Sequence, residues 1–210
     1  MPENTIKVID YGRGNLFSIE SALSHIGLEA KFVSSPDEIL VPGPTILPGV
    51  GAFGDAMDAL KSQDIVEAIR QFSRSGDPLL GICLGMQVFA TRGEEFGDHA
   101  GLNIVKGVVV RLPKGDPNTD TIRVPNVGWR RVTVTQTGTE ISSVLDSGYF
   151  YFVHSYYLSV EKSDEVLATL RFNGADVAAA VRRENVVGCQ FHPERSGACG
   201  LNLLKAAFAG

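Results

Sequence analysis

One stretch, Pro78–Ala90, constrains the fold more than any other part of this chain. It opens with a short apolar run that is typical of a buried strand, and it continues as a helical apolar pattern. Between the two lies Gly81-Ile82-Cys83-Leu84-Gly85, in which a cysteine is flanked by a glycine two positions away on each side. This is the spacing of a nucleophile elbow, where the glycines allow a strand and a helix to close on a sharp turn. The stretch predicts an α/β fold with Cys83 at that turn.

The chemistry of Cys83 follows from its predicted place. A thiol at a helix N-terminus faces aligned backbone N–H dipoles, which favour the thiolate form. The thiolate, and not the thiol, attacks a carbonyl carbon. The alternative is a buried structural cysteine between a strand and a helix. The two glycines favour the nucleophile, since a merely buried cysteine does not need them.

Strand-like and helical segments alternate through the first half of the chain. Strands are expected at Thr5–Asp10, Glu29–Val33 and Thr45–Leu47, and helices near 16–26, 55–61 and 64–74. This order predicts a mostly parallel central sheet flanked by helices on both faces. Active sites of such sheets lie at the carboxyl ends of the strands, which is where the Pro48–Gly54 loop and Cys83 fall.

After Gly101 the pattern changes to strands with little helix, which predicts an antiparallel extension. We expect this half to continue the same core, so that residues 1–210 form a single domain. The expected elements are strands at Ile104–Leu112, Trp129–Thr135, Tyr149–Ser155, Val166–Phe172, Val177–Arg182 and Val186–Phe191, and a closing helix at 200–209.

Composition excludes several classes of function. The net charge of −5 gives no basic surface for nucleic acid or an anionic membrane. No apolar run reaches the roughly 20 residues of a membrane span, and the N-terminus lacks the pattern of a secretory signal. Cys83, Cys189 and Cys199 have neither a disulfide framework nor a metal-ligand spacing, so we expect a cytoplasmic protein without a bound metal. Gly12 and Gly14 lack the third glycine of a dinucleotide site.

A nucleophilic cysteine needs a base, and the base needs a group that orients it. His192 leaves a buried strand and is followed by Pro193 and Glu194. Because proline favours extended geometry in the residue before it, Glu194 is expected on the same side as His192, holding the imidazole. His154, at the end of another strand, is a second candidate base.

An acyl-transfer site also needs two donors for the developing oxyanion. The N–H of Leu84, directly after the nucleophile, is one candidate. The Val50 amide in Pro48-Gly49-Val50-Gly51 is the other, because glycines allow a backbone to approach a ligand closely. The alternative for this loop is a plain glycine-rich turn.

Taken together, Gly81–Gln87, Pro48–Phe53 and Phe191–Glu194 resemble the motifs of the class I (triad) glutamine amidotransferases, in the same order along the chain. Further features resemble in particular the glutaminase subunits of imidazole glycerol-phosphate synthase. They are Asp10-Tyr11-Gly12-x-Gly14-Asn15-Leu16, the Pro-Gly-Val-Gly-x-Phe loop, Pro125–Trp129, Tyr151–Tyr156, and a tail at 192–197. Arg130 and Arg195 stand where that family more often has Asn and Lys.

The resemblance implies an activity and a set of roles. Cys83 would be the nucleophile, His192 the base and later the acid, and Glu194 the orienting group, and His154 would be structural. L-glutamine would be hydrolysed to L-glutamate and ammonia without a cofactor. The residues implied for glutamine binding are Gly51, Gln87, Glu95, Ser155 and Tyr156.

The resemblance also implies a partner. Free ammonia becomes mostly ammonium in neutral water, so a glutaminase of this kind passes it to a second subunit, a cyclase barrel that makes imidazole glycerol phosphate. Asn15, Trp129 and Tyr151 are the implied contacts with that partner. Because Gly49 and Gly51 lower the cost of rotating the Val50 peptide, that peptide is a candidate switch controlled by the partner.

Four alternatives stay open on the sequence. The chain could supply ammonia to another synthase, for example one that amidates a sugar nucleotide, and Arg130 is the feature that favours this. It could be a glutaminase of the pyridoxal-phosphate synthase type, a cysteine peptidase or amidase of similar fold, or a non-catalytic scaffold. The presence of Cys83, His192 and Glu194 together argues against the scaffold.

Overall fold

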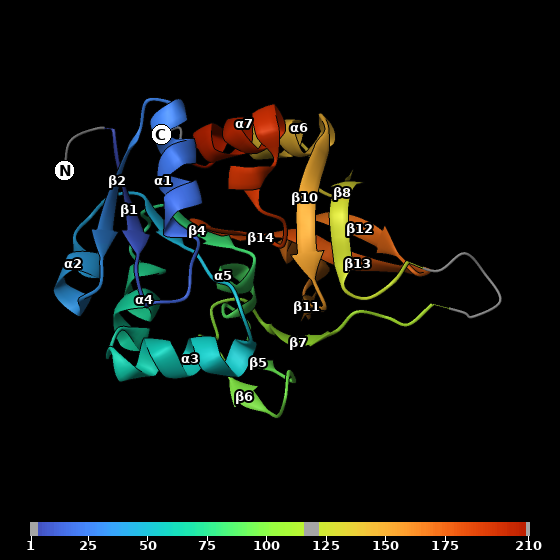
Figure 1. Cartoon of the computed structure of the whole chain (residues 1–210), viewed down its shortest axis with the longest axis horizontal. Coiled ribbons are helices and arrows are strands. Elements are labelled where there is room, and N and C mark those ends of the chain that lie inside the picture. The colour runs from blue at the N-terminus through green and yellow to red at the C-terminus, as the bar shows by residue number, and fades with distance from the viewer. Residues whose placement is uncertain (1–3, 116–121, 209–210) are drawn as a thin grey trace.

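The computed structural model describes residues 4–115 and 122–208. Its largest sheet has the strand order β2-β1-β3-β4-β14-β13-β12-β9 and is covered by helices on both faces (Figure 1). The strands from β2 to β14 pair in parallel, and the rest of the sheet is antiparallel. The predicted mostly parallel sheet with an antiparallel extension is therefore confirmed. The strands are β1 (Thr5–Ile9), β2 (Glu29–Val33), β3 (Thr45–Leu47), β4 (Leu79–Ile82), β9 (Thr133–Val134), β12 (Val166–Phe172), β13 (Ala175–Arg183) and β14 (Val186–Cys189).

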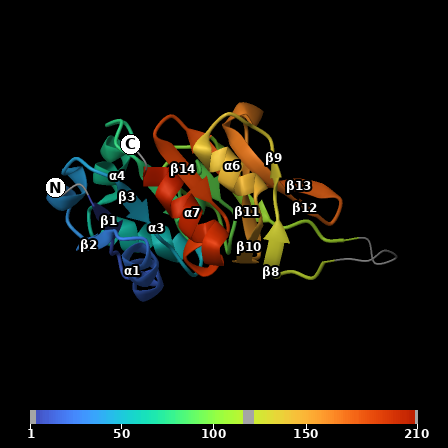
Figure 2. The same ribbon diagram turned by 90° about the horizontal axis from the view of Figure 1, so that it is seen from above.

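Helices connect the successive parallel strands β1 to β4, since parallel neighbours need a crossover connection. Apolar side chains on successive residues of β4 point to opposite faces of the sheet, Leu80 and Ile82 into one core and Leu79 into the other. Helices α1, α6 and α7 cover the first face (Figure 2), and α2, α3, α4 and α5 pack into the second core. The helices are α1 (Leu16–His25), α2 (Pro36–Leu40), α3 (Phe53–Ser62), α4 (Val66–Phe72), α5 (Leu84–Gln87), α6 (Glu140–Asp146) and α7 (Gly197–Phe208).

Two smaller sheets stand beside the large one. One pairs β10 (Tyr149–His154) with β8 (Asn126–Arg131), and the other has the order β11-β7-β5-β6. The strands of the second are β11 (Tyr156–Val160), β7 (Gly107–Arg111), β5 (Arg92–Gly93) and β6 (His99–Ala100). The strand expected at Trp129–Thr135 is thus split between β8 and β9, which belong to different sheets. The elements α2, β5, β6, α6 and β11 were not predicted.

The topology brings three distant segments to one edge of the large sheet. Strands β3, β4 and β14 are parallel neighbours, so their carboxyl ends lie together. Leu47 leads into the loop Pro48–Ala52 before α3, Ile82 leads into Cys83, and Cys189 leads into Gln190 and the segment that follows. The functional motifs of the sequence therefore meet at this edge.

Candidate active site

Cys83 occupies a strained turn between β4 and α5. Its backbone has φ 54° and ψ −109°, a region that costs a non-glycine residue about 1–3 kcal/mol. Two hydrogen bonds hold it there: the Cys83 N–H donates to the Cys189 carbonyl at 2.8 Å, and the Gln87 N–H donates to the Cys83 carbonyl at 3.1 Å. The predicted elbow is present, although the helix after it is one short turn.

The flanking glycines are required by close packing. A Cβ on Gly81 would lie 2.4 Å from the Phe89 ring, and a Cβ on Gly85 would lie 1.9 Å from the Leu47 carbonyl oxygen. Neither space accepts a side chain, because real Cβ contacts are not this short. The glycines thus allow α5 to press against β3 and carry the thiol to the edge of the sheet.

His192 and Glu194 form a buried pair beside the cysteine. The His192 Nδ1 lies 2.7 Å from Glu194 Oε1, and the two side chains are 6% and 2% exposed. The His192 N–H donates to the Tyr151 carbonyl at 2.9 Å, which fixes the residue to β10. With Nδ1 committed to the carboxylate, Nε2 is the ring nitrogen left for proton transfer with Cys83.

The link between His192 and Glu194 differs from the expected one. His192 itself is extended, but Pro193–Arg195 forms a turn of 3₁₀ helix, with proline at its first position. The fixed φ of proline suits a helical start, so the chain bends after His192 and does not continue straight. The carboxylate therefore reaches the imidazole through a tight turn.

Electrostatics favour a charged His192. Burial by itself lowers the pKa of His192, but hydrogen bonds to Cys83 and Glu194 and the attraction of their negative charges outweigh it and raise the pKa to about 10. An imidazolium at neutral pH is the partner that a cysteine thiolate requires. The neighbouring Cys189 behaves differently, because burial raises the pKa of its thiol well above the usual value.

A cavity of about 220 Å³ joins most of the residues predicted from sequence. Glu194 lies behind His192 and is not part of this wall, and Asn15, Trp129 and Tyr151 lie outside it. The lining residues are Val50, Gly51, Cys83, Leu84, Gln87, Glu95, Val153, His154, Ser155, Tyr156 and His192.

The two candidate oxyanion donors are in different states. Leu84 is the first residue of α5, so its N–H has no acceptor within the helix and borders the cavity. The Val50 N–H instead donates to the Arg13 carbonyl at 3.2 Å. Gly51, at φ +102°, adopts a conformation suited to glycine, and a Cβ on Gly49 would lie 2.7 Å from the Tyr11 hydroxyl. In this structure the Val50 donor is engaged away from the thiol.

Gln87 and Glu95 offer acceptors to a ligand. Both hydrogens of the Gln87 amide are used, at 2.9 Å to the Tyr156 carbonyl and at 3.0 Å to Gln190 Oε1, so only its carbonyl oxygen remains. Glu95 Oε2 accepts the Phe53 N–H at 2.8 Å, at the start of α3. This bond anchors the carboxylate in the cavity wall. A carboxylate and an amide oxygen suit a ligand that carries an ammonium group.

His154 is held neutral by its surroundings and is not placed as a base. Its Nδ1 lies 2.9 Å from the Tyr156 carbonyl, and its Nε2 lies 2.9 Å from the Asn126 side-chain nitrogen. Burial lowers the pKa of His154 to about 4, against a weaker opposing effect of the Tyr156 carbonyl. Both ring nitrogens are occupied, so the ring is a structural support.

This pKa predicts a specific loss of stability in acid. Between pH 6.5, the ordinary pKa of histidine, and about pH 4, the unfolded chain binds a proton at His154 that the folded chain does not. The stabilisation is therefore complete above pH 6.5 and is lost as the pH falls, by about 1.4 kcal/mol per pH unit and ~3 kcal/mol in total. Urea unfolding of the wild type and of His154→Gln from pH 7 to pH 4 measures this loss of unfolding free energy. Equal pH slopes in the two proteins would contradict this assignment.

Two residues at the site were missed by sequence reasoning. Gln190 is fully buried, and its Nε2 lies 3.7 Å from Cys83 Sγ. The Tyr11 hydroxyl donates to the Pro48 carbonyl at 3.0 Å, and burial, with the nearby charge of Cys83, raises the pKa of Tyr11 so that it keeps its proton. A polar glutamine at the end of an apolar strand was the available signal for Gln190.

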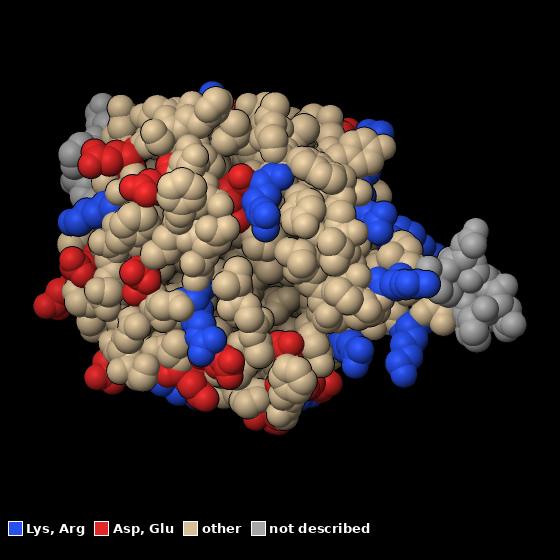
Figure 3. All heavy atoms as spheres, viewed as in Figure 1, with Lys and Arg blue, Asp and Glu red and all other residues tan. Residues whose placement is uncertain are grey.

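Two of the three predicted partner contacts, Trp129 and Tyr151, lie opposite each other on β8 and β10, and the third, Asn15, lies at the start of α1. Trp129 is 51% exposed and meets Tyr151 edge to face at 6.0 Å, and Arg195 lies over the Tyr151 ring at 5.3 Å. Asn15 is exposed and caps α1 by accepting the Ser18 N–H. Basic side chains gather on the side of the molecule that carries β8 and β12, whereas acidic ones lie mostly on the other side and below (Figure 3).

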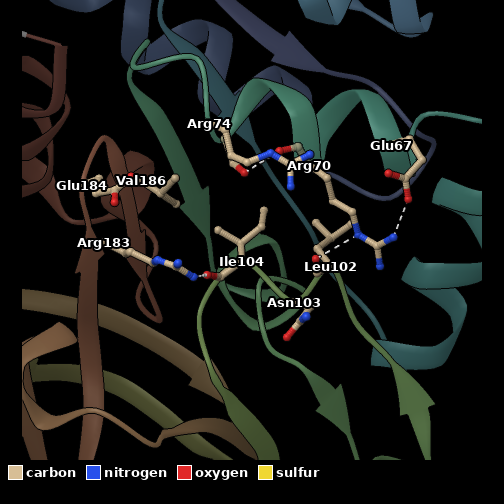
Figure 4. Close-up of a pocket in the computed structure, with 10 residues that line it drawn as sticks. Glu67, Arg70, Arg74, Leu102, Asn103, Ile104, Arg183, Glu184 and Val186 are labelled. Carbon is tan, nitrogen blue, oxygen red and sulfur yellow. Dashed lines mark hydrogen bonds and ion pairs between the residues drawn. The ribbon is translucent and has the colours of Figure 1, made fainter.

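A larger cavity, of about 420 Å³, lies away from the thiol (Figure 4). Arg70 donates there to the carbonyls of Leu102 and Gly101, and Arg183 donates to the carbonyl of Ile104. These arginines hold the loop between β6 and β7 against α4 and β13. Their donors serve the backbone, so we assign this cavity a structural role.

No helix among residues 4–115 and 122–208 is long and apolar enough to cross a membrane. Within the same residues, no group of three or more His, Cys, Asp or Glu side chains is arranged to hold a metal ion.

Comparisons with known proteins agree with this geometry. Residues 7–208 match the family model of glutamine amidotransferase class-I. The chain is 46% identical to "Imidazole glycerol phosphate synthase subunit HisH" of Desulfitobacterium hafniense (strain DSM 10664 / DCB-2), covering 95% of this chain and 92% of the relative. It is 38% identical to "Imidazole glycerol phosphate synthase subunit HisH 1" of Legionella pneumophila (strain Paris), covering 96% and 97%.

Among solved structures, PurLQS from Thermotoga maritima has the same fold, with a TM-score of 0.70 at 18% identity over 98% of this chain and 97% of that one. The family match spans nearly the whole chain, and the HisH relatives match it at well above 30% identity. The chain therefore belongs to the class I glutamine amidotransferases and, within them, to the family of the HisH subunits.

Proposed function

We propose that this chain is the glutaminase subunit of an imidazole glycerol phosphate synthase, and that it passes ammonia from L-glutamine to a cyclase subunit in histidine biosynthesis. The observation that carries the proposal is the buried His192–Glu194 pair beside Cys83 at one cavity, in a chain 46% identical to a HisH subunit. Residues 1–210 act as a single domain in this proposal, and the three free cysteines fit a reducing cytoplasm.

In the first half-reaction, the Cys83 sulfur attacks the amide carbon of glutamine. A sulfur–carbon bond forms, and His192 gives its proton to the leaving nitrogen as the carbon–nitrogen bond breaks and ammonia departs. Glu194 keeps the imidazole in one tautomer and stabilises its charged form. In the second half-reaction, His192 takes a proton from water, the resulting hydroxide attacks the thioester, and glutamate and the thiolate are released.

Glutamine is proposed to lie between the thiol and the acceptor side of the cavity. The Glu95 carboxylate and the Gln87 carbonyl oxygen receive the α-ammonium group. Gly51, Ser155 and Tyr156 line the remaining wall. The carbonyl of Tyr156 is already an acceptor for Gln87 and His154, so this residue keeps the wall rigid.

The oxyanion intermediate is proposed to be held by the N–H groups of Leu84 and Val50. For the second donor, the Val50 peptide must leave the Arg13 carbonyl, at a cost of about 1 kcal/mol for one backbone hydrogen bond. Gly49 and Gly51 lower the barrier to that rotation. The free subunit is then a poor glutaminase, and the partner stimulates it by favouring the rotated peptide.

The partner surface in this proposal is the outer face of β8 and β10 with the nearby end of α1. The ladder of Trp129, Tyr151 and Arg195 presents aromatic and cationic groups of the kind that anchor protein interfaces. Asn15 caps α1, and α1 packs against the 3₁₀ turn that holds Arg195. Arg130 donates to the Asn126 side chain at 3.2 Å, so the residue that departs from the family pattern is partly turned inward.

The test is glutamate release from glutamine by the chain alone, with a HisF-type cyclase, and with the cyclase and its nucleotide substrate. We expect a strong increase only in the complete mixture. A glutaminase rate that does not change when this cyclase is added would support the glutaminase activity, but would indicate that another synthase receives the ammonia. A high rate of the chain alone, unchanged by the partner, would contradict the role of the Val50 peptide.

A further inference from the structure

A buried chain of polar side chains ends on the nucleophilic sulfur. Gln190 Nε2 lies 3.7 Å from Cys83 Sγ, and Gln190 Oε1 accepts from Gln87 Nε2 at 3.0 Å. Gln87 Nε2 also donates to the Tyr156 carbonyl at 2.9 Å. Gln190 is fully buried and does not line the cavity, so its amide contacts the thiol from the protein side and not from the side of the substrate.

One atom, the Tyr156 carbonyl oxygen, fixes the direction of every hydrogen bond in this series of side chains. A backbone carbonyl oxygen only accepts, so the group of Gln87 that faces Tyr156 O must be its NH₂. The same NH₂ then faces Gln190, which must present its carbonyl oxygen in return. The NH₂ of Gln190 is left facing the sulfur, and a flipped amide would place two donors or two acceptors together.

A second series of hydrogen bonds starts from the same Tyr156 carbonyl oxygen, and its directions are fixed in the same way, because a carbonyl oxygen only accepts. His154 Nδ1 faces Tyr156 O and is therefore its protonated nitrogen, which leaves Nε2 as the acceptor for the Asn126 NH₂. The Asn126 oxygen then accepts from Arg130 Nε. All the bonds of both series are consistent with one another, so the carbonyl is held from two sides and the orientation of Gln190 is reinforced.

We propose that Gln190 is a catalytic residue that donates an N–H to the Cys83 sulfur, stabilises the thiolate and holds it in the attacking position. A hydrogen bond to an ionised acceptor is stronger than one to a neutral group. This bond favours the state that attacks and weakens once the sulfur is acylated, which assists the restoration of the thiolate at the end of the cycle. The inference deepens the proposed glutaminase role of Cys83 and rests on it.

Gln190→Glu removes the NH₂ donor that faces the Cys83 sulfur while the side chain keeps nearly the same shape. The carboxylate still accepts from Gln87, but it offers no hydrogen to the sulfur and repels the thiolate. Gln190→Met removes the donor without adding charge. We expect the rate of Cys83 alkylation by iodoacetamide, followed by mass spectrometry of the peptide, to fall on the order of 10-fold in Gln190→Met and up to about 100-fold in Gln190→Glu.

Steady-state kinetics distinguishes this role from a structural one. Under the conditions where the wild type is most active, kcat for glutamine should fall with the alkylation rate in both variants. KM should change little in Gln190→Glu, because that variant keeps an acceptor for Gln87 and residue 190 does not line the cavity. A rise in KM at unchanged kcat and alkylation rate would overturn the proposal. So would a loss of stability in urea without slower alkylation.

The matched control is Gln136→Glu. Gln136 likewise uses its amide as a hydrogen-bond donor, to the backbone carbonyls of Asp164 and Val166, and like Gln190 it does not line the cavity. It should lose stability while Cys83 keeps its alkylation rate. Alkylation needs no partner, so a wild type with a reactive Cys83 that fails to respond to the cyclase would contradict the proposed acceptor and leave the Gln190 test intact. Wild-type alkylation rates in both Gln190 variants would overturn the inference itself.

Discussion

Cys83→Ala should lose glutaminase activity by at least about 10⁴-fold, measured as glutamate released in the presence of the stimulating partner. The reason is that no other group at the cavity can form the thioester. His192 and Glu194 retain their contact, but an imidazole next to a methyl group has no nucleophile to activate. The cavity itself should persist, because Cys83 contributes little volume to it, so glutamine binding measured by calorimetry should survive.

Cys199→Ala is the control for this experiment. Cys199 is a free, half-buried cysteine of α7 that does not line the cavity. Its replacement should leave activity within a few-fold of the wild type. A Cys83→Ala protein that keeps a tenth of the wild-type rate would refute the thioester route. It would also remove the basis for the proposed role of Gln190.

Gly85→Ala should destabilise the protein by about 3 kcal/mol or more, in the range of a severely overpacked site. Its Cβ would lie 1.9 Å from the Leu47 carbonyl oxygen and 2.9 Å from the Leu47 carbonyl carbon. Both are backbone atoms of β3, so relief requires a shift of the strand and not of a side-chain tip. The shift would move the Pro48–Gly51 loop, so activity should fall together with stability.

Gly27→Ala separates this steric effect from the ordinary cost of replacing a glycine. Gly27 has φ +82°, and a Cβ there would have open space around it. We expect a loss of about 1 kcal/mol from the left-handed backbone alone, with activity retained. Guanidinium unfolding of both variants measures the difference. Equal losses would show that α5 can move away from β3 without penalty.

Local signals in the sequence predicted the fold class and named the candidate catalytic residues. The elbow and the strand–helix alternation each report their own structure through glycine or apolar spacing. The His192-Pro193-Glu194 segment indicated the contact between imidazole and carboxylate, but not the 3₁₀ turn that makes it. The parallel-sheet rule then placed Cys83 and the Pro48–Gly54 loop at one edge. These inferences hold because the residues of β3, β4 and β14 both favour strands locally and are buried in the core as the apolar pattern predicts.

Only the tertiary structure decided the hydrogen-bond partners. Val50 carries a donor whose target, the Arg13 carbonyl, lies 37 positions away, and Gln190 reaches Cys83 across 107. No local pattern encodes such pairs, because they depend on how neighbouring strands set two loops side by side. The splitting of β8 from β9 has the same cause, since the two strands pair with different sheets. The sequence by itself determined which groups are present at the edge of the sheet, and packing decided which of their atoms face one another.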